Sequence, residues 1–120
     1  MAVALGGLTA RRNYDYRSEF SIWDDAAVKR PASSTEHFGR GAALEAMDRK
    51  PEAKAEYEIA LRLRHDYFEA HSNLGRLLTE ELRFDEAMTH LKAALAVLPD
   101  FPEANLNLGV ALDREGQTDA

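Results

Sequence analysis

The sequence contains no cysteine, and only 15 of its 120 residues are lysine or arginine. The absence of cysteine excludes disulfides, thiolate zinc sites, iron–sulfur clusters and cysteine nucleophiles. Because 21 aspartates and glutamates give a formal net charge of −6, we expect no broad basic surface for nucleic acid and no nucleic-acid partner. No stretch approaches the roughly 18 consecutive apolar residues of a membrane-spanning helix. The remaining composition, 45% apolar and 30% charged, is typical of a globular domain.

Motifs of catalytic and cofactor sites are also missing. There is no G-x-S-x-G element, no P-loop and no G-x-G-x-x-G fingerprint. The four histidines are His37, His65, His71 and His90. No two of them have the i, i+4 spacing of a helical metal pair, and no triad of carboxylates accompanies them. We therefore interpret them as structural and predict no catalytic residue, no metal site, no cofactor and no small-molecule substrate. The chain is predicted not to be an enzyme.

The sequence does contain an internal repeat of 34 residues. Gly41, Gly75 and Gly109 are spaced by that period, and a leucine follows each of them three positions later. Ala53 and Ala87 have the same spacing. Small residues in these columns let two helices approach closely, and leucines at three- and four-residue steps give each helix an apolar stripe. The pattern predicts stacked helix pairs that bury their apolar faces against their neighbours.

This repeat resembles the tetratricopeptide repeat (TPR) family, whose 34-residue pattern has Leu-Gly, Ala and Pro at fixed positions. The unit over 68–101 carries Leu74-Gly75, Ala87 and Pro99 in those columns, whereas the unit before it has Arg40 where leucine is usual. The resemblance extends over roughly residues 18–120. It implies an all-α fold, a right-handed α-solenoid of antiparallel helix pairs.

The repeat frame divides the chain into five units. They are a leader over 1–17, the second helix of an incomplete repeat over 18–33, complete repeats over 34–67 and 68–101, and the first helix of a truncated repeat over 102–120. The predicted helices lie near 18–30, 35–48, 51–64, 69–82, 85–98 and 103–115. Leu82 occupies a turn column where glycine is common, and we expect that turn to be helical. The stop at Ala120, before a second helix, favours a piece of a longer array over a terminal capping helix.

The resemblance implies a protein–protein interaction module or scaffold that binds a peptide or a partner protein on its concave face, which the first helices of the repeats form. The residues predicted to line that face are Glu69, Asn73, Arg76, Glu80, Glu103, Asn107, Val110 and Arg114. The asparagine amides can donate and accept hydrogen bonds with a peptide backbone, and arginine can bind a carboxylate. Acidic chaperone tails are not expected, because Phe38 and Glu103 occupy basic columns of the clamp that holds them.

The N-terminal part suggests a second function. Arg12-Asn13, Trp23 and Pro31, followed directly by the repeats, resemble the junction of multi-pass membrane proteins with a C-terminal TPR domain, glycosyltransferase-like ones included. This resemblance implies a non-catalytic domain on the extracytoplasmic face, with the leader a remnant of a membrane helix and membrane attachment in the full-length protein. The ten residues before Arg11 are too few to span a bilayer, however. A free-standing adaptor would instead be cytoplasmic.

A third function is a structural array that self-associates. The first helix of the truncated repeat has no second helix to cover it, so Leu108 and Leu112 would be left on an open C-terminal face. A homo-oligomer would form if that face paired with another copy.

Overall fold

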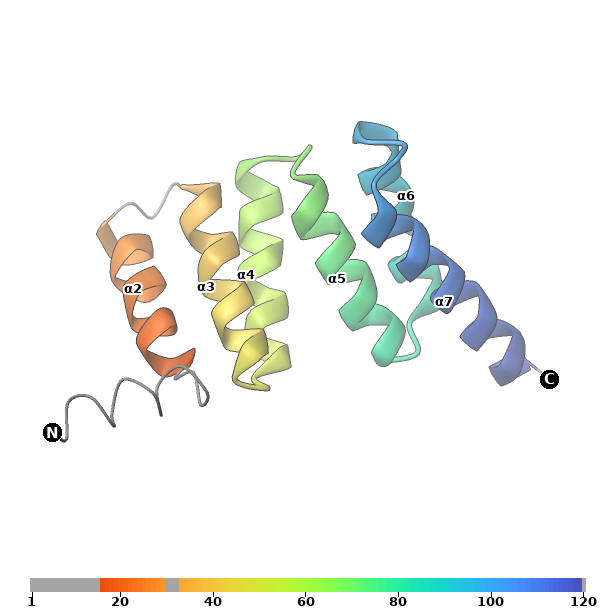
Figure 1. Ribbon diagram of the computed structural model, residues 1–120, viewed down its shortest axis with the longest axis horizontal. Coiled ribbons are helices and arrows are strands. Elements are labelled where there is room, and N and C mark those ends of the chain that lie inside the picture. The colour runs from red at the N-terminus through yellow and green to blue at the C-terminus, as the bar shows by residue number, and fades with distance from the viewer. Residues whose placement is uncertain (1–15, 30–32, 120) are drawn as a thin grey trace, which may run out of the picture.

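The computed structural model describes residues 16–29 and 33–119. In these ranges the chain forms six helices and no strand (Figure 1), which confirms the all-α class. The helices are α2 (Tyr16–Lys29), α3 (Ser34–Ala46), α4 (Lys50–Leu63), α5 (Phe68–Glu80), α6 (Phe84–Val97) and α7 (Pro102–Asp119). Each begins within two residues of its predicted start.

The helices are arranged as a solenoid of successive pairs. In the two complete repeats α3 packs against α4 and α5 packs against α6, while contacts of α4 with α5 and of α6 with α7 join one pair to the next. The first helices of consecutive repeats also meet, because α5 packs against α7. Each pair therefore contacts the next pair along the array, and the first helices α3, α5 and α7 lie on one side of it.

Glycines in the repeat allow the two helices of a pair to approach closely. A Cβ added at Gly41 would lie 2.8 Å from Cε1 of Tyr57, and one added at Gly75 would lie 2.5 Å from Cγ of Leu91. Both distances are shorter than a van der Waals contact, so these columns must stay small. A Cβ at Gly109 would meet no atom within 4 Å, because no described helix covers that side of α7.

The main hydrophobic core runs through both complete repeats. Its buried members include Leu44 and Tyr57 from the first repeat and Leu74 from the second. Phe38 extends it, with its ring 5.5 Å from the Tyr57 ring and 4.9 Å from the Tyr67 ring between centroids. The core therefore fills both the space within each helix pair and the space between the pairs, which fixes where the first helices lie.

Arg40, which replaces the usual leucine, connects three helices. Its guanidinium forms ion pairs with Asp24 of α2 at 2.9 Å and with Glu56 of α4 at 2.8 Å. It also lies 5.3 Å from the centroid of the Phe20 ring on α2, a distance at which a cation is attracted to an aromatic face. The equivalent Leu74 in the second repeat is buried. The departure from the repeat pattern thus holds α2 against the first repeat.

Two sequence predictions about the turns are wrong. Leu82 is not helical but has a φ of 63°, and Asp48, one repeat earlier, has a φ of 62°. A left-handed residue lets the chain leave one helix and enter the next within three residues. In the third repeat Gly116 stands in this column, yet α7 runs on to Asp119 and not to 115 as predicted. No second helix packs against α7 there among the described residues to bend the chain.

The leader predicted over 1–17 lies outside the described residues except for its last two positions, and so does the junction-like element that it contains. Among the described helices none is both long enough and apolar enough to cross a membrane. Membrane attachment of a longer protein stays a prediction.

Candidate peptide-binding surface

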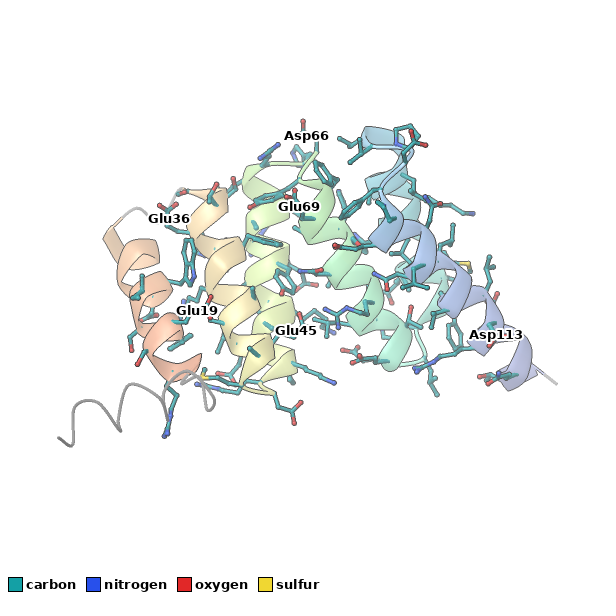
Figure 2. The ribbon with its side chains drawn as sticks, in the orientation of Figure 1. Glu19, Glu36, Glu45, Asp66, Glu69 and Asp113 are labelled. Carbon is teal, nitrogen blue, oxygen red and sulfur yellow. The ribbon has the colours of Figure 1, made fainter. Side chains whose placement is uncertain are left out.

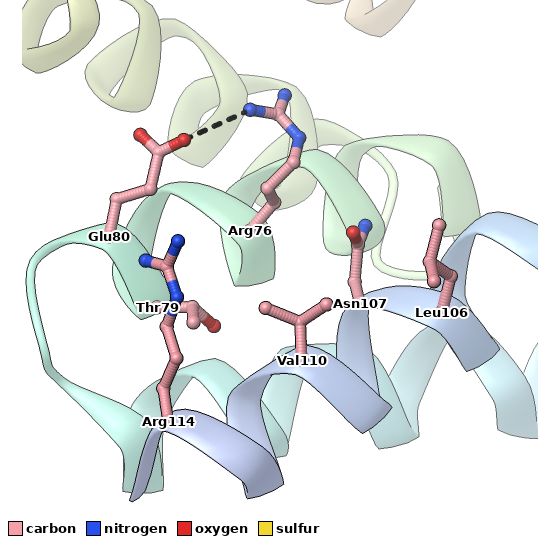
Figure 3. A pocket seen from close by; sticks show the side chains of 7 residues that line it. All are labelled: Arg76, Thr79, Glu80, Leu106, Asn107, Val110 and Arg114. Atoms are coloured by element: carbon pink, nitrogen blue, oxygen red, sulfur yellow. Dashed lines mark ion pairs between the residues drawn. The ribbon is translucent and has the colours of Figure 1, made fainter. Parts of the chain in front are cut away.

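A pocket of about 200 Å³ lies between the first helices of the second and third repeats (Figure 3). We call it the α5–α7 pocket. Its lining residues are Arg76, Thr79 and Glu80 from α5 and Leu106, Asn107, Val110 and Arg114 from α7. On each helix these positions recur at steps of three or four residues, which places their side chains on one face. The pocket exists because α5 and α7 pack directly against each other along those faces.

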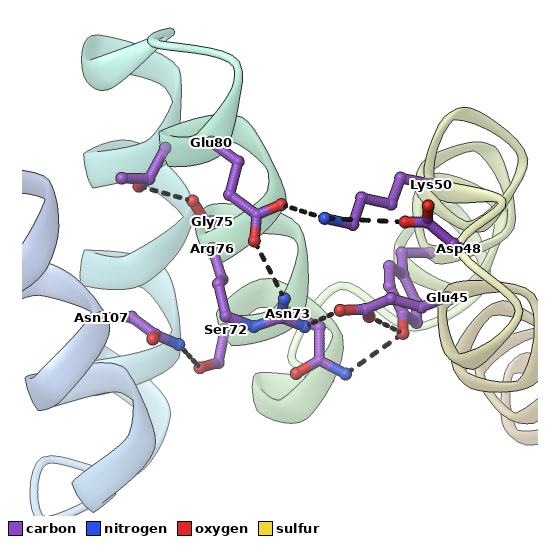
Figure 4. Close-up of polar contacts among 11 residues, drawn as sticks. Glu45, Asp48, Lys50, Ser72, Asn73, Gly75, Arg76, Glu80 and Asn107 are labelled. Atoms are coloured by element: carbon purple, nitrogen blue, oxygen red, sulfur yellow. Dashed lines mark hydrogen bonds and ion pairs between the residues drawn. The ribbon is translucent and has the colours of Figure 1, made fainter.

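One of the two arginines in the α5–α7 pocket is neutralised by neighbouring carboxylates. Arg76 forms ion pairs with Glu45 of α3 and, at 3.7 Å, with Glu80 one turn further along α5. Glu80 in turn accepts a hydrogen bond from Nζ of Lys50 at 3.0 Å (Figure 4). This chain of alternating charges fastens α5 to the first repeat, so Arg76 is not a free cation.

Arg114 differs, because it has no ion pair with any other residue that the structure describes. It lies beside Val110, which is partly exposed, and Leu106, whose exposed fraction of 68% is high for a leucine. A cation next to exposed aliphatic side chains suits a ligand that presents a carboxylate and an apolar group together. This combination is the main chemical character of the α5–α7 pocket.

The two predicted asparagines hold neighbouring helices together. Nδ2 of Asn107 donates to Oγ of Ser72 on α5 at 3.1 Å, and Nδ2 of Asn73 donates to the hydroxyl of Tyr57 on α4 at 3.4 Å (Figure 4). Neither carboxamide oxygen accepts a hydrogen bond from another described residue. Both oxygens therefore remain free to accept an N–H from a bound peptide backbone.

Tyr57 is the buried anchor of this polar network. Its hydroxyl donates to Oε1 of Glu45 at 2.8 Å while its ring is fully buried. Burial, followed by the negative charge of Glu45, raises the pKa of the Tyr57 hydroxyl, so the group stays protonated and remains a donor. Because Glu45 also binds Arg76, the position of Arg76 beside the pocket depends on a side chain buried in the first repeat.

The structure brings five of the eight predicted site residues to the α5–α7 pocket. They are Arg76, Glu80, Asn107, Val110 and Arg114. Glu69 lies at the opposite end of α5 (Figure 2) and Glu103 in the first turn of α7, so neither reaches it, and Asn73 lies in the adjoining network. Thr79 was not predicted. It is buried and donates its hydroxyl hydrogen to the Gly75 carbonyl. Its position three residues after Arg76, on the same face of α5, could have predicted that it lines the pocket.

The described side chains offer no set of three histidines, aspartates or glutamates placed to hold a metal ion. With the side chains that line it, the α5–α7 pocket can bind a ligand through hydrogen bonds, ion pairs and apolar contacts.

Comparison with known proteins agrees with this architecture. Residues 75–116 match a family model described as TPR repeat. No curated protein sequence matches the chain. Among solved structures, the Arabidopsis OM64 TPR domain has a TM-score of 0.80 at 18% sequence identity, covering 90% of this chain and 89% of that one.

Crystal structures of MamA are similar as well. One has a TM-score of 0.79 at 21% identity and covers 94% of this chain and 66% of that one. The MamA RS-1 ArsTM double mutant has a TM-score of 0.78 at 22% identity, with coverages of 97% and 65%. The chain thus spans about two thirds of the length of MamA. These likenesses establish the fold: the chain is an α-helical repeat protein. Residues 75–116 carry a match to the TPR repeat, and the helical architecture is that of the TPR domains named above.

Proposed function

We propose that the chain binds a segment of a partner protein in the α5–α7 pocket and has no catalytic role. The observation that carries the proposal is Arg114, which forms no ion pair with another described residue and lies beside the exposed Leu106 and Val110. In this mode a carboxylate of the ligand binds Arg114, an aliphatic side chain packs on Leu106 and Val110, and the carboxamide oxygen of Asn107 accepts a backbone N–H. The partner is therefore a peptide that carries an acidic group next to an aliphatic residue.

Peptides selected on the wild-type chain from a random display library should accordingly be enriched in Asp or Glu, or a terminal carboxylate, adjacent to Leu, Ile or Val. We expect Arg114→Gln to weaken binding of such a peptide by roughly 10-fold or more, because a hydrogen bond to a charged group contributes about 1.5–3 kcal/mol. Fluorescence anisotropy with the labelled peptide measures this loss.

The matched control is Arg62→Gln, which removes an exposed arginine from α4, outside the α5–α7 pocket. It should leave the affinity unchanged. A selected pool without acidic groups, or equal affinities for wild type and Arg114→Gln, would count against the proposal.

Self-association is a second candidate function, favoured by the open side of α7. In the first two repeats a second helix covers the repeat glycine, but the space beside Gly109 is open and Leu112 is 52% exposed. A second copy packed there would bury this leucine. A sedimentation mass that rises with concentration and falls back in Leu112→Glu would support this function, whereas a constant monomer mass would oppose it.

A further inference from the structure

The two complete repeats place different side-chain pairs in the same two columns. In the first repeat His37 of α3 meets Glu56 of α4, with Nδ1 and Oε2 2.9 Å apart. Thirty-four residues later the same columns hold His71 of α5 and His90 of α6, whose Nδ1 atoms lie 3.0 Å apart. In the first repeat a protonated histidine is therefore paired with the carboxylate of Glu56. In the second repeat a protonated His71 faces another imidazole, that of His90.

The hydrogen bonds determine how many protons the His71–His90 contact can hold. Nε2 of His71 lies 2.8 Å from the carbonyl oxygen of His65 and must donate to it, because a carbonyl only accepts. In the neutral pair Nδ1 of His71 is then the acceptor, and Nδ1 of His90 donates to it. The ring centroids are 5.3 Å apart, close to the largest separation that this nitrogen contact permits, so the nitrogens face each other head-on. One hydrogen fits between them.

A single added proton leaves the contact intact. When His71 is protonated, its Nδ1–H donates to Nδ1 of His90, and His90 changes tautomer so that its own hydrogen lies on Nε2. When both rings are protonated, two N–H groups and two positive charges face each other across 3.0 Å. The contact then becomes repulsive.

The surroundings of the pair do little to offset a second charge. The two rings border a pocket of about 320 Å³ and are half-buried. The ionisable side chains around them are Glu58 and Arg62 of α4, His65 of the following connection, and Glu86 one turn before His90. Neither ring forms a hydrogen bond with a carboxylate in the described part of the chain. Burial lowers the pKa of His90, the charge of His71 lowers it further, and Glu86 acts in the opposite direction.

We propose that the His71–His90 pair makes the second repeat acid-sensitive. The contact between α5 and α6 is stable while the pair is neutral or carries one added proton, and it opens when the pair takes up a second proton. In the unfolded chain each histidine titrates independently near its ordinary pKa of about 6.5. The unfolded chain therefore binds more protons than the folded pair as pH falls, so stability is complete above about pH 6.5 and is lost below it. Because α5 carries Arg76 and Glu80, opening would also disturb the α5–α7 pocket.

The variant His90→Glu tests this inference, because it recreates the His–Glu pair of the first repeat. Thermal unfolding of the whole chain would be followed at about pH 7.5 and about pH 5.5, either side of the ordinary histidine pKa. We expect the acid-induced fall in Tm to be larger in wild type than in His90→Glu by roughly 5 °C. His37→Gln, which alters the first pair only and removes a histidine whose charge Glu56 matches, should show a fall at least as large as that of wild type. Equal falls in wild type and His90→Glu would overturn the inference.

A second measurement needs no variant and so does not depend on how His90→Glu folds. NMR titration of the imidazole Cε1–H signals in wild type should show the pKa of His90 below its ordinary value, because burial and the facing His71 disfavour its charged form. Amide hydrogen exchange at about pH 5.5 should speed up in α5 and α6 but not in α3 and α4. A pKa of His90 at its ordinary value of about 6.5, or equal acceleration in both repeats, would contradict the inference.

Discussion

Tyr57→Ala should destabilise the chain by about 3–5 kcal/mol, as truncation of a buried aromatic residue to alanine does. Tyr57 is fully buried, packs onto Gly41 where α3 and α4 approach closely, and binds Glu45 through its hydroxyl. Its loss leaves a cavity within the first repeat and frees one end of the network that holds Arg76. Such a loss is a large part of the total stability of a small domain. Urea unfolding followed by far-UV circular dichroism measures it.

Tyr57→Phe separates the two contributions, because it keeps the ring and removes only the hydroxyl. We expect it to cost about 1–3 kcal/mol, because the carboxylate of Glu45 loses a hydrogen bond in a partly buried site. Its effect should be smaller than that of Tyr57→Ala. If both variants unfolded at the same urea concentration, the ring would not contribute to the core as the structure shows.

Alanine at two equivalent glycines should change stability in opposite directions. At Gly75 the added methyl would lie 2.5 Å from Cγ of the fully buried Leu91 and 3.1 Å from the backbone oxygen of Ala87. Because neither neighbour has room to move, we expect Gly75→Ala to cost about 1–3 kcal/mol. At Gly109 the methyl meets open space, so Gly109→Ala should gain about 0.5–1 kcal/mol through helix propensity.

Each of the two glycine variants is the control for the other, since both place the same residue in the same column within a helix. Thermal unfolding of the two variants and wild type would decide the signs. A gain in Gly75→Ala would mean that α5 and α6 are further apart than in the structure. A loss in Gly109→Ala would mean that another chain covers the open side of α7.

The fold was predictable because successive repeats have small residues at the same positions, where their two helices pack closely together. Gly41 and Gly75 are separated by the period that also separates Ala53 and Ala87, and each pair of columns forms one close helix–helix contact. Spacing of this kind depends on the sequence alone. The helix starts followed from the same frame to within two residues.

The wrong predictions at Leu82 and Gly116 have causes that cannot be read from the repeat spacing. Leucine is an unfavourable residue for a left-handed turn, so the sequence suggested a helical conformation at Leu82. Packing of α6 against α5 requires the sharp turn and outweighs that preference. At Gly116 the residue favours the turn, but no described helix packs against α7 to require it. Tertiary contact, and not residue preference, decides both positions.

The candidate site was predictable only in part, for a related reason. The repeat columns indicate which residues point from the first helices, and five of them line the α5–α7 pocket. They do not indicate that Glu45 neutralises Arg76, because these two residues belong to different repeats. Nor do they indicate that Arg114 forms no ion pair with another described residue. The contact of His71 with His90 likewise joins residues 19 positions apart on different helices, which no spacing rule for one helix reveals.

The most direct test of the proposed function is to map where a selected peptide binds. The ¹⁵N-labelled chain would be titrated with a library-selected peptide that carries an acidic group beside an aliphatic residue, and the backbone amide shifts recorded. We expect the shifts to concentrate on residues 76–80 and 106–114 and to vanish in Val110→Glu but not in Val97→Glu, which makes the same change at a similarly exposed valine of α6. Shifts centred on α4 and α6, or unchanged binding in Val110→Glu, would contradict the account.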